Sequence, residues 1–180
     1  MELNDERIYI SLDLQSPILN AKMPNNVSWH NLKDLPVSFG WQHNDFFLNK
    51  LKNFLFTYNE QVPWNEVLNI DDIYKFLQDE NDINILMENH DVIGWAWQNK
   101  NHTDSIKLKK HQIYQSRWLI DKKFLFKKSN KGLSLAWIQE LKKYYRKEGF
   151  TQGVAYIDDW NKGVLKSVLR AGYEIKNWNK

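Results

Sequence analysis

The second half of the chain switches repeatedly between two hydrophobic periods, and this switching limits the folds that it can adopt. Ile83–Met87 and Val92–Gln98 are apolar runs on either side of the polar turn Glu88–Asp91, a pattern typical of a β-hairpin. Leu133–Lys147 then places apolar residues at helical spacing, and Gly149 follows it as a residue suited to ending a helix. These patterns predict a sheet that carries helices.

Similar patterns continue over the rest of the chain. The other predicted elements are a strand at Arg7–Leu14, helices at Asp45–Tyr58 and from about Asp71, a long strand within 111–126, a strand at Val154–Ile157, a helix at Trp160–Ala171 and a short strand at Tyr173–Ile175. Residues 15–42 are expected to be loop. Hairpin strands are antiparallel, whereas a crossover through the Leu133–Lys147 helix makes the two strands that flank it parallel. The expected fold class is α/β, with a mixed, mostly antiparallel central sheet flanked by helices.

Length and composition describe one ordinary globular chain. Its 180 residues suit a single domain spanning 1–180, and no repeat or linker divides it. All four prolines lie within the first 63 residues, so residues 1–70 are expected to contain the irregular part. The acidic start Met1–Glu6 is no signal peptide, and no apolar run is long enough to cross a bilayer. We therefore expect a cytoplasmic protein that does not enter membranes.

Several kinds of site are excluded by what the sequence lacks. It has no cysteine, so disulfides, thiolate metal sites and a cysteine nucleophile are ruled out. Its five histidines show no metal-ligand spacing, and there is no Gly-x-Ser-x-Gly or Walker motif, so no metal site is expected. The net charge of +3 is mild, with one basic concentration at Lys122–Lys131. That concentration suits the phosphates of a small ligand as well as a nucleic acid.

A glycine-containing basic loop precedes the Leu133–Lys147 helix. The first N–H groups of a helix lack intrahelical partners and carry partial positive charge, so they attract anions. Ser129, Asn130 and Gly132 let the backbone approach a ligand closely, and the neighbouring lysines add charge. The loop is therefore a candidate pyrophosphate cradle built from the amides of residues 130–134, with a plain basic turn as the alternative.

Three patterns between about Ile83 and Ile175 resemble the GNAT (Gcn5-related N-acetyltransferase) superfamily. The hairpin residues Ile85–Gly94 are similar to the family's strand, its turn and the Val-Gly pattern at the start of its next strand. Ser129–Ser134 stands where the family has Arg/Gln-x-x-Gly-x-Gly/Ala, with the first glycine kept and both the leading Arg/Gln and the second glycine replaced by serine. Asn161–Tyr173 fits the family's asparagine, apolar helix and Gly-Phe/Tyr pair. The chain thus resembles one GNAT-like acyltransferase domain.

The resemblance implies an acyl-CoA-dependent N-acyltransferase, with acetyl-CoA as the default co-substrate, in which an amine attacks the thioester directly. It implies these cofactor-binding residues: Phe124, Leu125, Phe126, Ser129, Asn130, Lys131, Gly132, Leu133, Ser134 and Asn161. The resemblance places a strand end at Phe124–Phe126, whose backbone would pair with the pantetheine arm as with an additional strand. A backbone N–H there would also stabilise the oxyanion. Asn161 would contact the cofactor through its amide, and it also suits a helix N-cap.

The catalytic residues are less sharply marked than the cofactor site. A carboxylate acting through water would serve as general base. The candidates are Asp121 and Glu88, with Asp158 and Asp159 behind them. Many GNAT members have a tyrosine seven residues after the asparagine, placed to protonate the leaving thiolate, and that position is Val168 here. The proton would then come from Tyr156 or Tyr173, or the thiolate would leave unaided.

The acceptor is expected to be a small-molecule amine, and the divergent residues 1–70 are expected to form part of its binding side. We expect a monomer or homodimer that does not bind nucleic acid. Nine tryptophans supply aromatic surface that would suit a sugar-like acceptor such as an amino sugar, although core filling is favoured for any one of them. Two alternatives stay open. One is a catalytically degenerate GNAT-like module that binds a cofactor or partner. The other is an unrelated aromatic-rich carbohydrate or nucleic-acid binder with tryptophans exposed along a groove.

Overall fold

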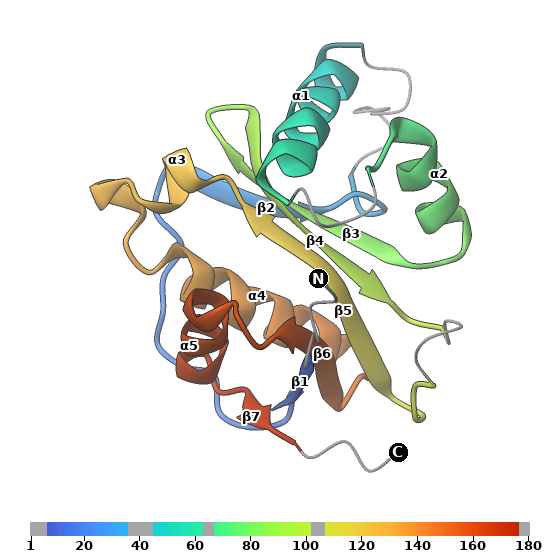
Figure 1. Cartoon of the computed structure of the whole chain (residues 1–180), viewed down its shortest axis with the longest axis vertical. Coiled ribbons are helices and arrows are strands. Elements are labelled where there is room, and N and C mark those ends of the chain that lie inside the picture. Colours follow the sequence, from blue (N-terminus) through green and yellow to red (C-terminus); the bar gives the residue numbers. More distant parts are fainter. Residues whose placement is uncertain (1–6, 36–44, 63–66, 102–106, 177–180) are drawn as a thin grey trace, which may run out of the picture. The chain divides into compact units, whose positions relative to one another are not determined.

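The computed structural model describes residues 7–35, 45–62, 67–101 and 107–176 (Figure 1). Its elements are β1 (Arg7–Asp13), β2 (Val27–Asn31), α1 (Asp45–Gln61), α2 (Ile70–Gln78), β3 (Asp82–Glu88), β4 (Asp91–Asn99), β5 (Gln112–Ile120), α3 (Lys122–Leu125), the 3-10 turn η2 (Lys128–Asn130), α4 (Leu133–Lys147), β6 (Gln152–Asp158), α5 (Lys162–Arg170) and β7 (Glu174–Ile175). The seven strands form one sheet in the order β2-β3-β4-β5-β6-β1-β7. None of the helices described is both long and apolar enough to span a bilayer.

The strand directions confirm the predicted fold class. The pairs β1–β6, β1–β7, β2–β3 and β3–β4 are antiparallel. The pair β5–β6 is parallel, because α4 crosses over between these two strands. A mixed, mostly antiparallel sheet with helices is therefore what the chain forms.

The strand predicted within 111–126 is confirmed as β5, but two finer predictions are wrong. The strand β2 falls in the stretch expected to be loop. Its five residues are too few to show a period, and the strand forms because its backbone pairs with β3, with Trp29 opposite Leu86. The end of β5, expected at Phe124–Phe126, lies at Ile120, because the Asp121 side chain accepts the N–H of Lys123 and so begins the helix α3.

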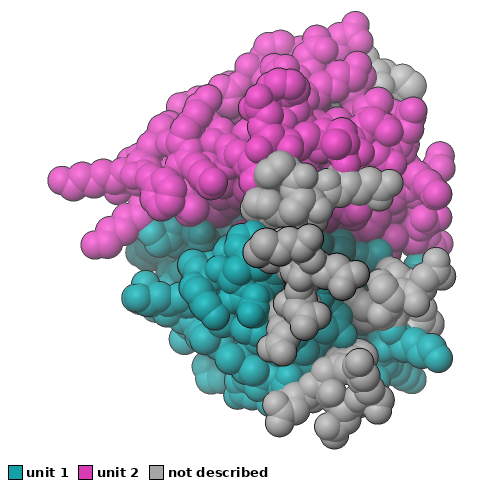
Figure 2. Space-filling model, in the orientation of Figure 1, with its two compact units in different colours: residues 1–22, 99–116, 132–180 teal, residues 23–98, 117–131 magenta. Residues whose placement is uncertain are grey.

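The chain divides into two compact units, coloured separately in Figure 2. Unit 1 comprises residues 1–22, 99–116 and 132–180, and unit 2 comprises residues 23–98 and 117–131. Each unit is built from segments that are far apart in the sequence. The basic loop and the first residues of α4 are consecutive in the chain, but the loop belongs to unit 2 and α4 to unit 1.

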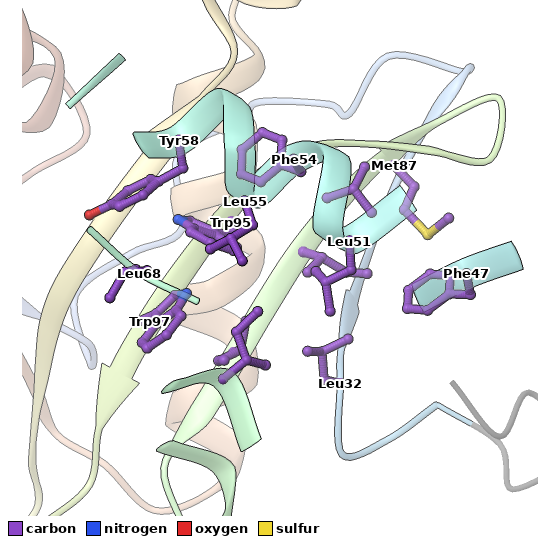
Figure 3. Close-up of a cluster of buried hydrophobic side chains, with 14 residues drawn as sticks. Leu32, Phe47, Leu51, Phe54, Leu55, Tyr58, Leu68, Met87, Trp95 and Trp97 are labelled. Carbon is purple, nitrogen blue, oxygen red and sulfur yellow. The ribbon is translucent and has the colours of Figure 1, made fainter. Parts of the chain in front are cut away.

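The core of unit 2 is an aromatic and aliphatic cluster between α1 and the strands β3 and β4 (Figure 3). Trp95 is fully buried, and its ring centroid lies 5.1 Å from that of Phe54, 4.8 Å from that of Tyr58 and 5.4 Å from that of Trp97. Trp97 and, in unit 1, Trp137 are equally buried. These three tryptophans fill cores, as was favoured for any single tryptophan.

In unit 1, the helix α4 is held by polar side chains to the segment that follows β1. The ammonium of the buried Lys142 donates to the Ser16 hydroxyl and to the Pro17 carbonyl, while the Arg146 guanidinium donates to the Leu14 and Ser16 carbonyls. Burial, together with the nearby Arg146 charge, lowers the pKa of Lys142. These contacts fix the helix whose first turn belongs to the candidate site.

Candidate functional site

The strands β3 and β4 are joined by a tight turn, and Glu88, just before this turn, contacts the basic loop. Asn89 and His90 have φ angles of 51° and 72°, and two left-handed residues in a two-residue loop match the twist of the strands they join. Glu88 and Asp91 lie opposite each other at the base of this turn. The polar turn expected from the sequence is confirmed, and Glu88 is the last residue of β3.

The next strand, β4, fixes the start of α3. A Cβ added to Gly94 would lie 2.9 Å from the Leu119 carbonyl oxygen, so a side chain at this position would collide with the backbone of β5. One residue earlier, the Ile93 carbonyl accepts the N–H of Asp121 at 2.9 Å. The close approach of the β4 and β5 backbones therefore determines the position of Asp121.

Glu88 is a buried carboxylate with three hydrogen-bond donors. Its side chain is 4% exposed and accepts from Lys127 Nζ, from Asn130 Nδ2 at 3.0 Å and from Asn26 Nδ2 at 2.9 Å. Burial alone would raise the pKa of Glu88, but the hydrogen bonds from Lys127 and Asn130 and the charge of Lys127 outweigh it, so that the pKa lies below its ordinary value. Such a carboxylate is a weak base, and its contacts favour a structural role over general-base catalysis.

The basic loop is organised by one buried side chain. Asn130 lies at the end of η2 and donates from Nδ2 both to Glu88 and to the Phe124 carbonyl at 3.1 Å. Its backbone N–H donates to the Lys127 carbonyl at 3.0 Å, and the N–H of Lys131 reaches the Lys128 carbonyl at 3.4 Å. These two amides, which were expected to bind phosphate, are therefore used inside the loop. Lys128 and Lys131 are exposed.

The helix α4 begins with a left-handed glycine. Gly132 has φ 84°, and no side chain caps the helix at this end. The first intrahelical bond runs from the Ala136 N–H to the Gly132 carbonyl, at 3.0 Å. For the amides of Leu133, Ser134 and Leu135, no acceptor is recorded in the part of the chain that the structure describes. This end of α4 therefore has the free donors and the dipole that attract an anion.

Phe124, Leu125 and Phe126 do not form a strand end. They lie in α3 and at its C-cap, where their backbone follows a helical path. The ammonium groups of Lys127 and Lys123 lie over the Phe124 ring, 4.1 and 5.1 Å from its centroid. Phe126 is 79% exposed. A pantetheine arm cannot pair with these residues in the way that an added strand pairs with a sheet edge. The strand backbone nearest to them in the chain is the end of β5, at Ile120.

Asp121 is buried between β5 and α3. Its Oδ1 accepts the Lys123 N–H and the Gln61 side-chain amide, both at 3.0 Å. For Oδ2, no hydrogen bond is recorded among the described residues. One oxygen therefore caps the helix, and the other is available to a water or a substrate.

Three further predicted positions lie in unit 1. Asn161 accepts the Val164 N–H at 3.3 Å and is the N-cap of α5, so the predicted capping role is confirmed. Val168 is buried on the inner side of that helix. Tyr173 is also buried, donates its hydroxyl proton to Gln115 Oε1 at 3.2 Å, and has its pKa raised by burial. Both its raised pKa and its hydrogen bond make Tyr173 a poor proton donor to a thiolate.

Two residues that shape the site escaped the sequence interpretation. Asn26 binds Glu88 from 62 residues away, and Gln61 binds Asp121 from 60 residues away. No local pattern marks either of them. Lys127, by contrast, lies inside the basic run that drew attention to the loop.

Comparison with known proteins identifies the fold. No family model and no curated protein matches the sequence. Among solved structures, a GCN5-related N-acetyltransferase from Sphaerobacter thermophilus matches 94% of this chain with a TM-score of 0.61 and 11% identity. The match covers 48% of that protein, so this chain spans about half of its length.

Two other neighbours are matched over most of their length. The structure of yncA, a putative acetyltransferase from Salmonella typhimurium with its cofactor acetyl-CoA, has a TM-score of 0.60 at 15% identity, over 85% of this chain and 82% of that one. An aminoglycoside acetyltransferase from an uncultured soil metagenomic sample, in complex with sisomicin, has a TM-score of 0.59 at 12% identity, over 87% and 96%. At such identities the likeness establishes the fold.

Proposed function

We propose that this chain, which has the fold of the GCN5-related N-acetyltransferases, binds an acyl-CoA and transfers the acyl group to the amine of a small molecule. The observation that carries the proposal is the start of α4. There the left-handed Gly132 leaves the amides of Leu133–Leu135 for a pyrophosphate, directly after a loop whose exposed lysines include Lys128 and Lys131. Acetyl-CoA is the default co-substrate, in keeping with the cofactor in the yncA structure.

The proposed cofactor contacts differ in part from those expected from the sequence. The amides of Gly132, Leu133 and Ser134 keep their role, and that of Leu135 joins them. Ser129, Asn130 and Lys131 shape and charge the loop. The pantetheine arm would bind the strand backbone before Asp121 in place of Phe124–Phe126, and an N–H there would stabilise the oxyanion. Asn161 would contact the cofactor with its side-chain N–H groups while its oxygen caps α5.

The proposed reaction is direct attack of a neutral amine on the thioester. The nitrogen lone pair forms the C–N bond, the tetrahedral oxyanion collapses, and the C–S bond breaks to release the thiolate. Proximity and the oxyanion donor supply much of the acceleration. The amine loses one proton to water or to Asp121. Since Tyr173 is engaged with Gln115, the thiolate leaves unaided or takes its proton from Tyr156 or from water.

The acceptor is proposed to be a small amine such as an amino sugar, in line with the aminoglycoside acetyltransferases among the neighbours. We propose that residues 1–180 act as one domain and that residues 1–70 contribute to the acceptor side. Trp95, Trp97 and Trp137 are buried in cores, so any stacking on a sugar face falls to other aromatic side chains.

The substitution Asp121→Asn tests the proposed base. Asparagine caps helices as well as aspartate, so the start of α3 and the stability are expected to be unchanged. Loss of the carboxylate is expected to lower kcat by about 100-fold or more, with the Kd for acetyl-CoA unaltered. Steady-state kinetics and thermal unfolding measure both. Asp121→Ala serves as the control that also removes the cap, and an active Asp121→Asn enzyme would exclude Asp121 as the base.

Titration with acetyl-CoA in a calorimeter tests the function, with coenzyme A and ATP as comparison ligands. Micromolar binding of acetyl-CoA and much weaker binding of ATP are expected. Release of free thiol with a panel of amino sugars and other amines would then establish turnover. Binding without turnover on any amine would favour the catalytically degenerate module, and no binding at millimolar acetyl-CoA would overturn the proposal.

A further inference from the structure

The buried carboxylate of Glu88 is the feature of unit 2 that the reaction does not use. A carboxylate removed from water is costly unless it is paired and hydrogen-bonded. Two of its three donors, Lys127 Nζ and Asn130 Nδ2, come from the basic loop, and the third comes from Asn26. The loop is therefore tied to the end of β3 by one anion.

These contacts hold both ends of the turn η2. Lys127 is its N-cap residue, and Asn130 is its last residue. Asn130 bridges Glu88 and the Phe124 carbonyl, so the same side chain also ties the loop to α3. Between the two anchored residues, Lys128 and Ser129 are exposed, and Lys131 follows them. The anchor thus fixes the backbone that carries Lys128 and Lys131.

The lysines of the loop also differ in whether their charge is balanced by a carboxylate. The ammonium of Lys127 lies against Glu88 and over the Phe124 ring, so its charge is balanced by the carboxylate. Lys128 and Lys131 have no ion pair recorded within the described residues. A carboxylate near a phosphate would repel it if it were unpaired, and its pairing with Lys127 removes that repulsion.

We infer that Glu88 is a positioning residue that holds the Lys127–Lys131 loop in the conformation that binds the coenzyme A phosphates. Lys127 serves this anchor, and Lys128 and Lys131 are the lysines that meet phosphate. The inference rests on the proposed function, and it assigns Glu88 to cofactor affinity in place of proton transfer.

The test is the pair of variants Glu88→Gln and Asp82→Asn. Asp82 is the matched control, because it is a fully buried carboxylate at the opposite end of β3 and pairs with Lys33 at 3.4 Å. Both variants are expected to lose stability. Only Glu88→Gln is expected to weaken coenzyme A binding, by roughly 10- to 100-fold, with the KM for the amine unchanged. Hydrogen exchange at the Asn130 and Lys131 amides is expected to accelerate in Glu88→Gln alone.

The lysines give a second, independent readout. Lys128→Met and Lys131→Met are expected to weaken coenzyme A binding and flatten its salt dependence without changing thermal stability. Lys127→Met is expected to lower the melting temperature, because it leaves a buried carboxylate without its counter-charge. The double variant Glu88→Gln/Lys127→Met is expected to recover part of that stability, since neither charge is then left unpaired.

The outcomes separate this inference from the proposed function. If the unaltered protein binds no coenzyme A, the function fails, while the hydrogen-exchange comparison still tests the anchor. If Glu88→Gln binds coenzyme A as tightly as the unaltered protein and its loop amides exchange at the same rate, the anchor is overturned. A fall in kcat with normal coenzyme A affinity would overturn it as well, in favour of a general base.

Discussion

Gly132→Glu is expected to abolish acetyl-CoA binding while the protein remains folded. The new carboxylate would stand at the N-cap of α4, where the amides of Leu133–Leu135 are proposed to bind pyrophosphate. Two like charges about 4 Å apart repel by about 4 kcal/mol in a partly solvated protein site, which corresponds to a loss of about 1000-fold in affinity. Calorimetric titration with acetyl-CoA measures the loss.

Gly149→Glu is the matched control for this variant. Gly149 follows the opposite end of α4 with φ 90°, and a Cβ added to either glycine meets nothing within 4 Å. Both substitutions therefore introduce the same charge and a similar backbone strain, of about 1–2 kcal/mol for a left-handed residue. Only the change at Gly132 should affect the cofactor. Unchanged affinity in folded Gly132→Glu would remove the phosphate site from α4.

Trp95→Ala is expected to lower the free energy of unfolding by about 3–5 kcal/mol. Its indole fills the centre of the unit 2 core, in contact with the rings of Phe54, Tyr58 and Trp97 (Figure 3). Removing it leaves a cavity that rigid aromatic neighbours cannot close. A loss of this size is a large fraction of the stability of an ordinary domain, which is about 5–15 kcal/mol. Urea-induced unfolding followed by circular dichroism measures it.

Trp160→Ala provides the comparison for the core variant. Trp160 is 45% exposed, so the same substitution is expected to lower the free energy of unfolding by less than about 1 kcal/mol, as surface changes usually do. If Trp95→Ala unfolded at the same urea concentration as the unaltered protein, Trp95 would not be a core residue. It would then again be a candidate for the acceptor pocket.

The elements with long periodic patterns were predictable, and the short ones were not. The helices α1 and α4 begin at the predicted residues Asp45 and Leu133, because each repeats its apolar residues over several turns. β2 and α3 are too short to carry such a signal. The first exists through pairing with β3, and the second because Asp121 accepts a backbone N–H at the end of β5.

The same distinction applies to the candidate site. Gly132 before a helix and Asn161 as an N-cap are local features, since each depends on residues within four positions in the chain, and the structure places them as helix starts. The contacts of Glu88, the hydrogen bond of Tyr173 and the bond from Gln61 to Asp121 depend on partners that are 39 to 62 residues away. A carboxylate beside a turn looks the same in the sequence whether it is solvated or buried.

Local periodicity was therefore sufficient for the α/β class, the hairpin and the crossover helix, because backbone geometry repeats over neighbouring residues. The basic loop was recognisable from its glycine and lysines alone. Only the tertiary structure decided that Glu88 is enclosed by Lys127 and Asn130, and that Tyr173 donates to Gln115. It also decided that Phe124 lies in a helix. The physical reason is that burial and hydrogen bonding are set by which distant segments pack together, and these set the pKa and the chemistry of each side chain.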